Sequence, residues 1–413
     1  MYTVEKPAHV EATSLRASLR RGWGGVGANV WFLGVTSLLT DVSSEMITSV
    51  LPIYLVLHLG MSPLGFGFVD GLQHGVSALL RLASGGLSDR LQRHKEVAAA
   101  GYALSAACRL ALLPAGGHLA SLAAIVATDR AGKGIRTSPR DALISLSATS
   151  ESLGLAFGVH RSLDAAGAMF GPVVAFAVLA RHPDGFERLF IVSFLIALAG
   201  LGALLLLVRP AVAQPRRAAT AELAVLLRDA RLHRLAIAAG ALGLGVVGDG
   251  FLYLVLQRQS GIAASAFPLF FVGTSACYAL LATPAGHLAD RIGRRAMFLG
   301  GHALLFPAYA TALLAGPGWT ASVLCISFLG AYYAATDGVM MALSAALLPA
   351  ERRASGLALV GTAASLARLV GSIGFGLLWS QWGIAVALGG FASLLLLALG
   401  LAAPLLLRNE PFR

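Results

Sequence analysis

The sequence predicts an all-α polytopic membrane protein with about 12 transmembrane helices. Of its 413 residues, 57% are hydrophobic and only 12% are charged, whereas about a quarter of the residues in soluble domains are charged. Several stretches contain no Asp, Glu, Lys or Arg over the roughly 20 residues that a helix needs to cross a bilayer. The clearest are 189–208, 261–286, 296–315 and 384–407. A motif that recurs half a chain apart further predicts two related halves.

Hydropathy and the polar interruptions place the expected spans along the chain. Several spans contain polar residues, so hydropathy alone would undercount them. The spans are expected at approximately 28–57, 65–84, 97–115, 119–138, 155–180, 189–208, 233–257, 264–286, 296–315, 320–346, 356–378 and 384–407.

The loops between these spans alternate in charge. One set is basic and contains, for example, Arg90, Arg93 and Lys95, whereas the other set is short and nearly neutral. Basic loops stay in the cytoplasm, so we expect a bacterial inner-membrane protein with both termini cytoplasmic. The net charge of +11 is then explained by topology, and nucleic acid is not an expected partner.

The same pattern divides the chain into five parts. We expect a cytoplasmic tail at 1–27 rather than a signal peptide, a six-helix half at 28–208, a cytoplasmic linker at 209–232, a second six-helix half at 233–408, and a short tail at 409–413.

Three motifs occur once in each half. The pattern Gly-x-x-x-Asp-Arg-x-x-Arg contains Asp89 and Arg90 in its first copy and Asp290 and Arg291 in its second. The other two repeats are Ala-Thr-Asp, at 127–129 and 335–337, and Gly-Leu-Ala, at 154–156 and 356–358. This order of repeats predicts two pseudo-symmetric halves with a pathway between them.

These motifs resemble those of the major facilitator superfamily of secondary transporters, over essentially 28–408. The resemblance implies transport by alternating access, and it implies that Asp89, Arg90, Asp290 and Arg291 form cytoplasmic latches between the halves. Gln92 stands where the family usually has Gly.

Two further patterns carry the resemblance. Arg130 to Gly134 is similar to the family motif Arg-x-x-x-Gly, with Lys133 where Gln is common. The fifth span matches a helix-packing pattern of antiporters, Gly-x8-Gly-x3-Gly-Pro, which implies export, although the glycines usual after the proline are absent. Its residues are Gly158, Gly167, Gly171 and Pro172.

Two carboxylates in the first span are candidates for proton coupling. Asp41 and Glu45 are four residues apart and therefore share one helix face. Two carboxylates close together in a cavity of low dielectric do not both ionise readily, which suits proton binding and release. The alternative is a structural pair with Arg or Lys across the bundle.

The fourth span has a charged stripe on one face. Arg130 and Lys133 lie deep in the span and are expected in the pathway or gate, because charges at membrane depth are costly. Arg136 and Arg140 lie nearer the cytoplasm and are expected to be a basic loop end, with Pro139 ending the helix.

Other charged residues are isolated in their spans. Arg161 and Asp164, three apart in the fifth span, are expected to pair and to act in gating. Asp249, Asp337 and Arg368 each need a partner, which we expect from the first half. Asp249 and Asp337 are further proton-coupling candidates, and Arg368 is a pathway or gate candidate. Asp70, His74 and Arg81 could line the pathway, but position alone does not decide this.

No enzymatic, cofactor or metal motif stands out, and the three cysteines lie in apolar segments. We therefore predict a transporter, not an enzyme, with no cofactor and no metal. The favoured function is proton-coupled export of a small organic solute, and the alternative is import of an organic anion such as a siderophore-like metabolite. The expected partners are the solute, protons and the lipid bilayer, and the protein is expected to be a monomer.

Overall fold

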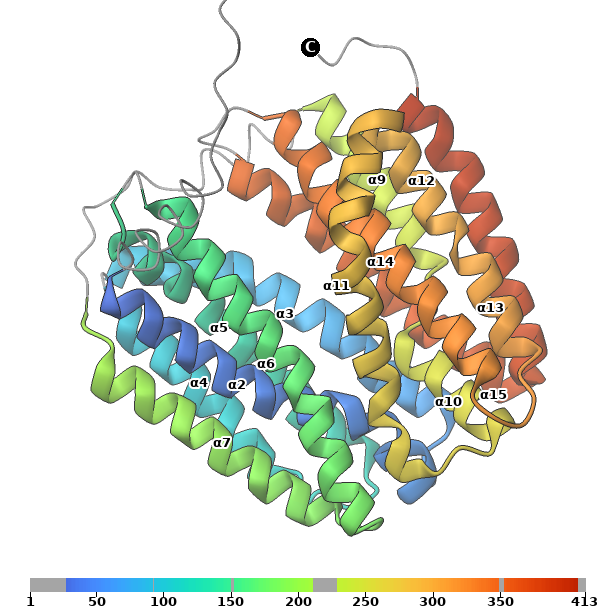
Figure 1. Ribbon diagram of the computed structural model, residues 1–413, viewed down its shortest axis with the longest axis horizontal. Helices are drawn as coiled ribbons and strands as arrows, with labels where there is room; N and C mark the ends of the chain where they lie inside the picture. The colour runs from blue at the N-terminus through green and yellow to red at the C-terminus, as the bar shows by residue number, and fades with distance from the viewer. Residues whose placement is uncertain (1–26, 92, 150–151, 211–228, 349–352, 408–413) are drawn as a thin grey trace, which may run out of the picture.

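The computed structural model describes residues 27–91, 93–149, 152–210, 229–348 and 353–407, without the side chains of 81–91 and 353–355. Every regular element in this part of the chain is helical, which confirms the predicted all-α class. The helices α2 to α7 form one half of the molecule and α9 to α15 the other, side by side in Figure 1.

The first half contains six helical spans. In α2, Pro52 lies in the last turn and the helix runs directly into the π-helix η1. The elements are α2 (Ala28–Ile53) with η1 (Tyr54–His58), α3 (Pro63–Leu91), α4 (His94–Ala111), α5 (Leu119–Leu146), α6 (Leu153–Arg181) and α7 (Phe186–Leu207).

Three of the second-half spans are interrupted. The elements are α9 (Ala230–Leu244), α10 (Asp249–Ser260), η2 (Ala264–Ala266), α11 (Pro268–Ile292), α12 (Arg294–Ala303), α13 (Leu305–Leu313), α14 (Thr320–Ala346) and α15 (Arg353–Leu407). The last of these is two spans joined at Gly383, whose φ of 83° is readily adopted only by glycine. The helical segments thus fill all twelve expected spans.

The break between α9 and α10 was not expected from the sequence. A backbone that leaves helical geometry inside a membrane must find other hydrogen-bond partners, and Tyr309 of α13 supplies them. Its hydroxyl accepts from the Val247 amide at 2.9 Å and donates to the Gly245 carbonyl at 2.9 Å. The break is therefore a fixed part of the fold.

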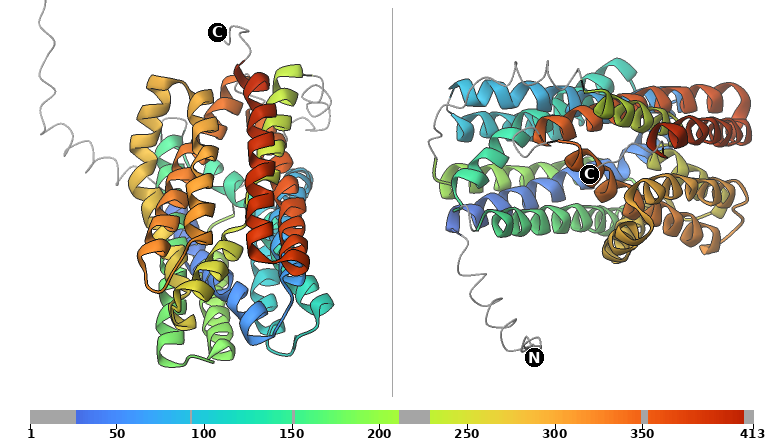
Figure 2. Two further views of the ribbon diagram at one scale, coloured as in Figure 1. Left: turned by 90° about the vertical axis from the view of Figure 1, so that its right-hand side faces the viewer. Right: turned by 90° about the horizontal axis from the view of Figure 1, so that it is seen from above.

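Helix pairing repeats between the halves. In the first half α2 packs on α6 and α7, and α5 packs on α3 and α4. In the second half the corresponding pairs are α9 with both parts of α15, and α14 with α11 to α13. The right panel of Figure 2 shows the bundle from above, with most helices running across the view. This repetition gives the pseudo-symmetry that the sequence motifs predicted.

Seven helical stretches of the described chain are long and apolar enough to cross a membrane on composition alone. They account for the last eight expected spans, because the stretch Gly356–Leu407 contains two. The first four spans, in α2 to α5, are less apolar because they contain the polar residues described below. The lower hydropathy of these four helices therefore reflects the polar residues of the candidate site.

In the described part of the chain the halves are in close aromatic contact on one side of the bundle. We call the side where α2 begins and α7 and α15 end the terminal side, and the opposite side the far side. On the far side, Phe251 of α10 lies 4.7 Å from Phe66 of α3 and 4.8 Å from Phe375 of α15, between ring centroids. The aromatic rings fill the space between the halves there.

Candidate functional site

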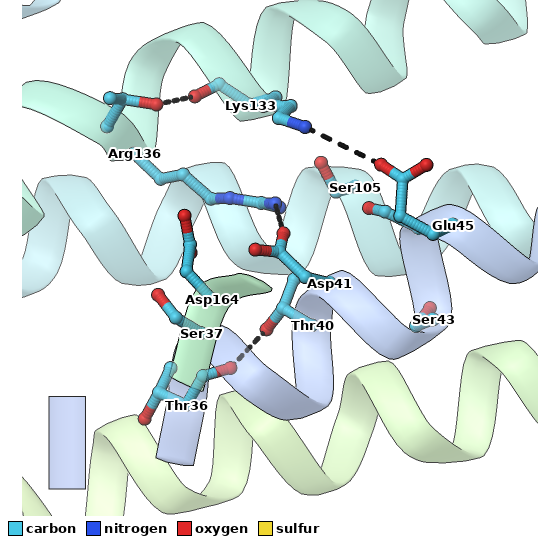
Figure 3. A network of polar contacts seen from close by, with 12 residues as sticks. Thr36, Ser37, Thr40, Asp41, Ser43, Glu45, Ser105, Lys133, Arg136 and Asp164 are labelled. Carbon is cyan, nitrogen blue, oxygen red and sulfur yellow. Dashed lines mark hydrogen bonds and ion pairs between the residues drawn. The ribbon is translucent and has the colours of Figure 1, made fainter. Parts of the chain in front are cut away.

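Two ion pairs join α2 to α5 in the interior of the first half (Figure 3). The Asp41 carboxylate is 3.6 Å from the Arg136 guanidinium, and the Glu45 carboxylate is 3.9 Å from the Lys133 ammonium. The acids are four residues apart and the bases three, so each pair of like residues shares one helix face. The charged face of α2 therefore lies against the charged face of α5.

A third helix brings another carboxylate to this network. The Asp164 carboxyl group of α6 belongs to the same network as the Asp41 carboxyl group, and the two are close enough to interact electrostatically. Arg140 is 3.5 Å from Asp164 and Arg161 is 3.6 Å from it. Asp164 thus has the partner on its own helix that the spacing predicted, together with a second arginine from α5.

Glycines let α6 approach α2 at this point. A Cβ atom on Gly167 would lie 2.5 Å from the Leu38 carbonyl oxygen, and one on Gly171 would lie 2.7 Å from the Val42 carbonyl oxygen. Pro172 is buried in the same helix. Gly158 differs from the expectation, because no atom lies within 4 Å of its added Cβ, and it is not a packing position.

The expected end of the fourth span at Pro139 is wrong. Helix α5 continues through Pro139 to Leu146, and both Arg136 and Arg140 are buried inside the bundle. Arg136 also lies over the Tyr102 ring at 4.7 Å. These two arginines belong to the buried network rather than to a basic loop end, because Asp41 and Asp164 neutralise them at depth.

A second cluster lies deeper in the first half. Arg109 of α4 is 2% exposed and forms an ion pair with Asp129 of α5. Its Nη2 donates to the Ser44 hydroxyl at 2.8 Å. Asp129 is also 3.4 Å from Arg130, whose Nη2 donates to the Thr48 hydroxyl at 3.1 Å. The buried Asp129 carboxylate therefore forms ion pairs with both Arg109 and Arg130.

The charged residues of the second half find partners within that half. Tyr333 donates to the Asp249 carboxylate at 2.8 Å, and Arg368 donates to the Tyr332 hydroxyl at 2.9 Å. Asp337, one turn beyond Tyr333, is close enough to interact electrostatically with Arg368. The hydrogen bonds of Asp249 and Arg368 come from tyrosines of α14 and not from the first half as expected. Of the first half, Asp70 is close enough to interact electrostatically with Arg368.

The two halves enclose a polar cavity of about 170 Å³ at the broken helix. The break between α9 and α10 forms part of its wall, which explains how an interruption in a membrane helix contributes to the site. The charged and polar side chains that line it include Asp70, Gln73, His74, Arg130, Asp249, Tyr333 and Arg368. The site therefore presents carboxylates and guanidinium groups to the same small space.

A second cavity of about 300 Å³ lies between α3, α5 and the first turns of α15. It shares Gln73, His74 and Arg130 with the central cavity. Lys133 is in its wall, so the Glu45–Lys133 pair lies beside this space. We call these two adjoining cavities, which extend from the centre toward the terminal side, the passage.

Asp70 connects the halves at the end of this passage. Its carboxylate accepts a hydrogen bond from Ser372 of α15, and both side chains are buried. Close packing of α3 on α15 surrounds the contact, since a Cβ on Gly71 would lie 2.8 Å from the Leu369 carbonyl oxygen. Position in the sequence left Asp70, His74 and Arg81 undecided. The structure puts Asp70 and His74 in the cavity wall, and the side chain of Arg81 lies outside the described part of the chain.

Sequence reasoning did not single out Arg109, Tyr332 or Tyr333. Arg109 could have been found, because it is a single cation near the middle of an otherwise uncharged stretch, 97–115, and such a charge needs a buried partner. The tyrosines gave no such signal, since aromatic residues are ordinary in apolar helices.

The second copy of the latch motif is open to solvent. Asp290 pairs with Arg294 of its own motif at 3.2 Å, and both side chains are about half exposed. Arg291 is exposed as well. Asp89 and Arg90 lie in the last turn of α3, and their side chains are outside the described part of the chain.

Comparison with known proteins assigns this architecture to a family. The model of the Major Facilitator Superfamily matches residues 33–273 and 237–413. An uncharacterized MFS-type transporter of Methanocaldococcus jannaschii is 28% identical over 361 residues, which is 85% of this chain and 88% of the relative. An uncharacterized protein of Mycobacterium tuberculosis is 30% identical over 278 residues, 65% of this chain and 67% of that protein.

Solved structures agree on the fold. The chain is similar to the nucleoside transporter NupG with a TM-score of 0.75 at 14% identity, covering 92% of this chain and 100% of NupG. It is also similar to a bacterial homologue of the human lysosomal transporter Spinster in an inward-facing, occupied conformation. That comparison has a TM-score of 0.70 at 16% identity and covers 91% of this chain and 96% of that one. The family match and the paired six-helix halves lead to one conclusion: the chain belongs to the Major Facilitator Superfamily, and it is a secondary transporter.

Proposed function

We propose that the protein exports a small organic solute in exchange for protons. The solute would occupy the central cavity, and the two halves would expose that cavity to each side of the membrane in turn. The observation that carries the proposal is the meeting of Asp41 and Asp164 beside two buried arginines. The predicted topology places the terminal side in the cytoplasm of a bacterial cell, so that the passage described here faces inward.

The Asp41–Asp164 contact has the properties of a proton site. Two ionised carboxylates that interact electrostatically, as Asp41 and Asp164 do, repel one another strongly in a medium of low dielectric. One proton shared between them removes the repulsion, while Arg136 and Arg140 balance the remaining negative charge. The site can therefore bind or release a proton without leaving a large uncompensated charge.

The proton site connects to the passage through two rigid helices. Asp41 shares α2 with Glu45, and Arg136 shares α5 with Lys133. A change in the Asp41–Arg136 distance shifts the same two helices that hold the Glu45–Lys133 pair. Since Lys133 lines the passage, proton binding would alter the charge that a solute meets.

Two observations bear on the direction of transport. The antiporter-like glycines Gly167 and Gly171 contact α2 beside Asp41 and Glu45, so the helix with the export pattern packs on the proton site. The alternative is import of an organic anion such as a siderophore-like metabolite. It is favoured by the guanidinium groups of Arg130 and Arg368, which line the cavity.

Proteoliposomes with an entrapped pH-sensitive dye test the coupling. Compounds that raise the melting temperature of the purified protein are first selected from a panel of small organic solutes. Each hit is then added under an imposed pH gradient, and proton flux is recorded. We expect solute-dependent proton flux in the wild type. Absence of such flux for every binding solute would refute proton coupling.

Asp41→Asn is the decisive variant for the proton site. It removes the ionisable group but keeps the side-chain size, so we expect solute exchange to continue and to lose its dependence on pH. Asp184→Asn makes the same chemical change at an exposed far-side residue and should behave as wild type. Retention of full pH dependence in Asp41→Asn would show that another group carries the proton.

Charge reversal at Lys133 separates the two directions. If the protein imports an anion, Lys133→Glu should abolish binding of the anionic solutes. If it exports, deletion of the gene should sensitise cells to the transported compound.

A further inference from the structure

The second half contains a pocket on the terminal side, apart from the transport passage. Its volume is about 440 Å³, and it lies where α9 begins, α11 meets α12, and α14 and α15 end. Figures 1 and 2 show these ends together at one end of the second half. The expected spans end near this level, so the predicted topology places the pocket at the headgroup region of one leaflet.

Four arginines from two segments line the pocket. Arg231 and Arg234 come from the first turns of α9, and Arg294 and Arg295 from the start of α12. Arg234 and Arg295 are near enough to repel one another. Asp290 pairs with Arg294, and Asp229 caps α9 by accepting from the Arg231 and Leu232 amides.

The rest of the pocket wall is apolar. It consists mainly of leucine and alanine side chains from the last turns of α14 and α15. Ile292 and Leu407 are 53% and 49% exposed there. A free inorganic anion would use the arginines alone, whereas a phospholipid would cover both the charged rim and the apolar wall.

In the first half, the position that corresponds to this pocket is filled by the side chain of Lys95. Lys95 donates to the Leu205 carbonyl at 2.9 Å and to the Val208 carbonyl at 2.7 Å, at the end of α7. Aligning Asp89 with Asp290 places Ala296 at the position of Lys95. The second half has no lysine there to reach the end of α15, and the pocket occupies this position.

From these four features we propose that the pocket binds one anionic phospholipid. Its phosphate would lie among the arginines of α9 and α12, and its acyl chains would run along the leucines of α14 and α15. Basic pockets between membrane helices commonly bind anionic headgroups. The lipid would connect α9, α12 and α15, and would supply the contact that Lys95 supplies in the first half.

Native mass spectrometry and lipid titration of the full-length protein test the proposal. The probes are phosphatidylglycerol, phosphatidylcholine with the same acyl chains, and inorganic phosphate. We expect one phosphatidylglycerol to bind per protein at the pocket and to raise the melting temperature. Phosphatidylcholine should bind far more weakly, and phosphate should have no comparable effect.

Two variants locate the site. Arg234→Gln with Arg295→Gln should weaken phosphatidylglycerol binding about 25-fold, since each basic residue near an anionic surface contributes about fivefold. Ala296→Lys keeps all four arginines but places a lysine where Lys95 lies in the first half, and it should also displace the lipid. Arg188→Gln, a matched charge loss on the far side, should leave binding unchanged.

The outcomes divide clearly. If both the double variant and Ala296→Lys bind phosphatidylglycerol as strongly as the wild type does, the proposed site is wrong. Equal binding of phosphatidylcholine would overturn the headgroup chemistry, and equal stabilisation by phosphate would overturn the lipid. Melting without lipid shows whether each variant is folded, and Ala296→Lys tests the pocket independently of the arginines.

Discussion

The Arg109–Asp129 pair offers the sharpest test of how this bundle holds charge. Arg109 is 2% exposed and Asp129 is 8% exposed, so neither charge is solvated by water. Removing one partner of a buried pair costs about 3–5 kcal/mol, because the other charge is left unpaired. The structure predicts different costs for the two residues.

Asp129 has two cationic partners and Arg109 has one anionic partner. Asp129→Asn removes the carboxylate that Arg109 and Arg130 share, so we expect the full cost of about 3–5 kcal/mol. Arg109→Met leaves Asp129 paired with Arg130 at 3.4 Å, so we expect about half that cost. The double variant should be less destabilised than the sum of the two single variants, because removing both charges leaves no orphan between them.

Thermal unfolding with a thiol-reactive dye measures these differences. Cys108 and Cys325 are buried, so the dye reports exposure of the core. At about 2 °C per kcal/mol, Asp129→Asn should melt roughly 5–10 °C below wild type and Arg109→Met roughly half as far. Equal shifts, or a larger shift for Arg109→Met, would refute the assignment of Asp129 as the shared counter-ion.

Three further results are expected. Gly167→Val should destabilise the protein by several kcal/mol in the same melting assay, because its Cβ would lie 2.5 Å from the Leu38 carbonyl oxygen. Gly158→Val, where the added Cβ has open space, should melt close to wild type. Similar melting temperatures for the two variants would contradict the packing of α6 on α2. Tyr309→Phe should cost about 1–3 kcal/mol by leaving the broken helix unsatisfied, and an unchanged melting temperature would mean that the break has other partners. Asp290→Asn should change stability by less than about 1 kcal/mol, because its pair with Arg294 is exposed; a larger loss in urea or heat titration would show that the latch is engaged.

The electrostatic arrangement has a consequence for transport. In the first half, the carboxylates of α2, α5 and α6 are each held by arginine or lysine, whereas the second half uses tyrosine hydroxyls for Asp249 and Arg368. The first half can therefore exchange one ionic partner for another. On the second-half side, the backbone at the helix break is held by Tyr309.

The candidate site was predicted in part. Asp41, Glu45, Arg130, Lys133 and Asp249 were found because an ionisable group at membrane depth is unfavourable unless it has a role or a partner. Their pairing was not predictable in the same way. Helical spacing shows which residues share a face, but it does not show which helix lies opposite that face.

Pro139 and the chain at Gly245 show the limits of local reasoning. A proline usually ends a helix, yet α5 continues through Pro139, because the buried pairs of Arg136 and Arg140 hold its last turns against α2 and α6. The span 233–257 was expected to be one helix, yet it breaks at Gly245, where Tyr309 of α13 satisfies the free backbone groups. Both outcomes depend on residues distant in sequence.

The sequence by itself determined the membrane class, the spans and the division into two related halves. These follow from hydropathy over about 20 residues and from motifs repeated about 201 positions apart, as Asp89 and Asp290 are. Only the tertiary structure decided that Asp41 meets Asp164, that Arg109 and Arg130 share Asp129, and that the passage faces the terminal side. The physical reason is that hydrophobic burial acts on each segment separately, whereas ion pairs and cavities exist only where particular helices pack together.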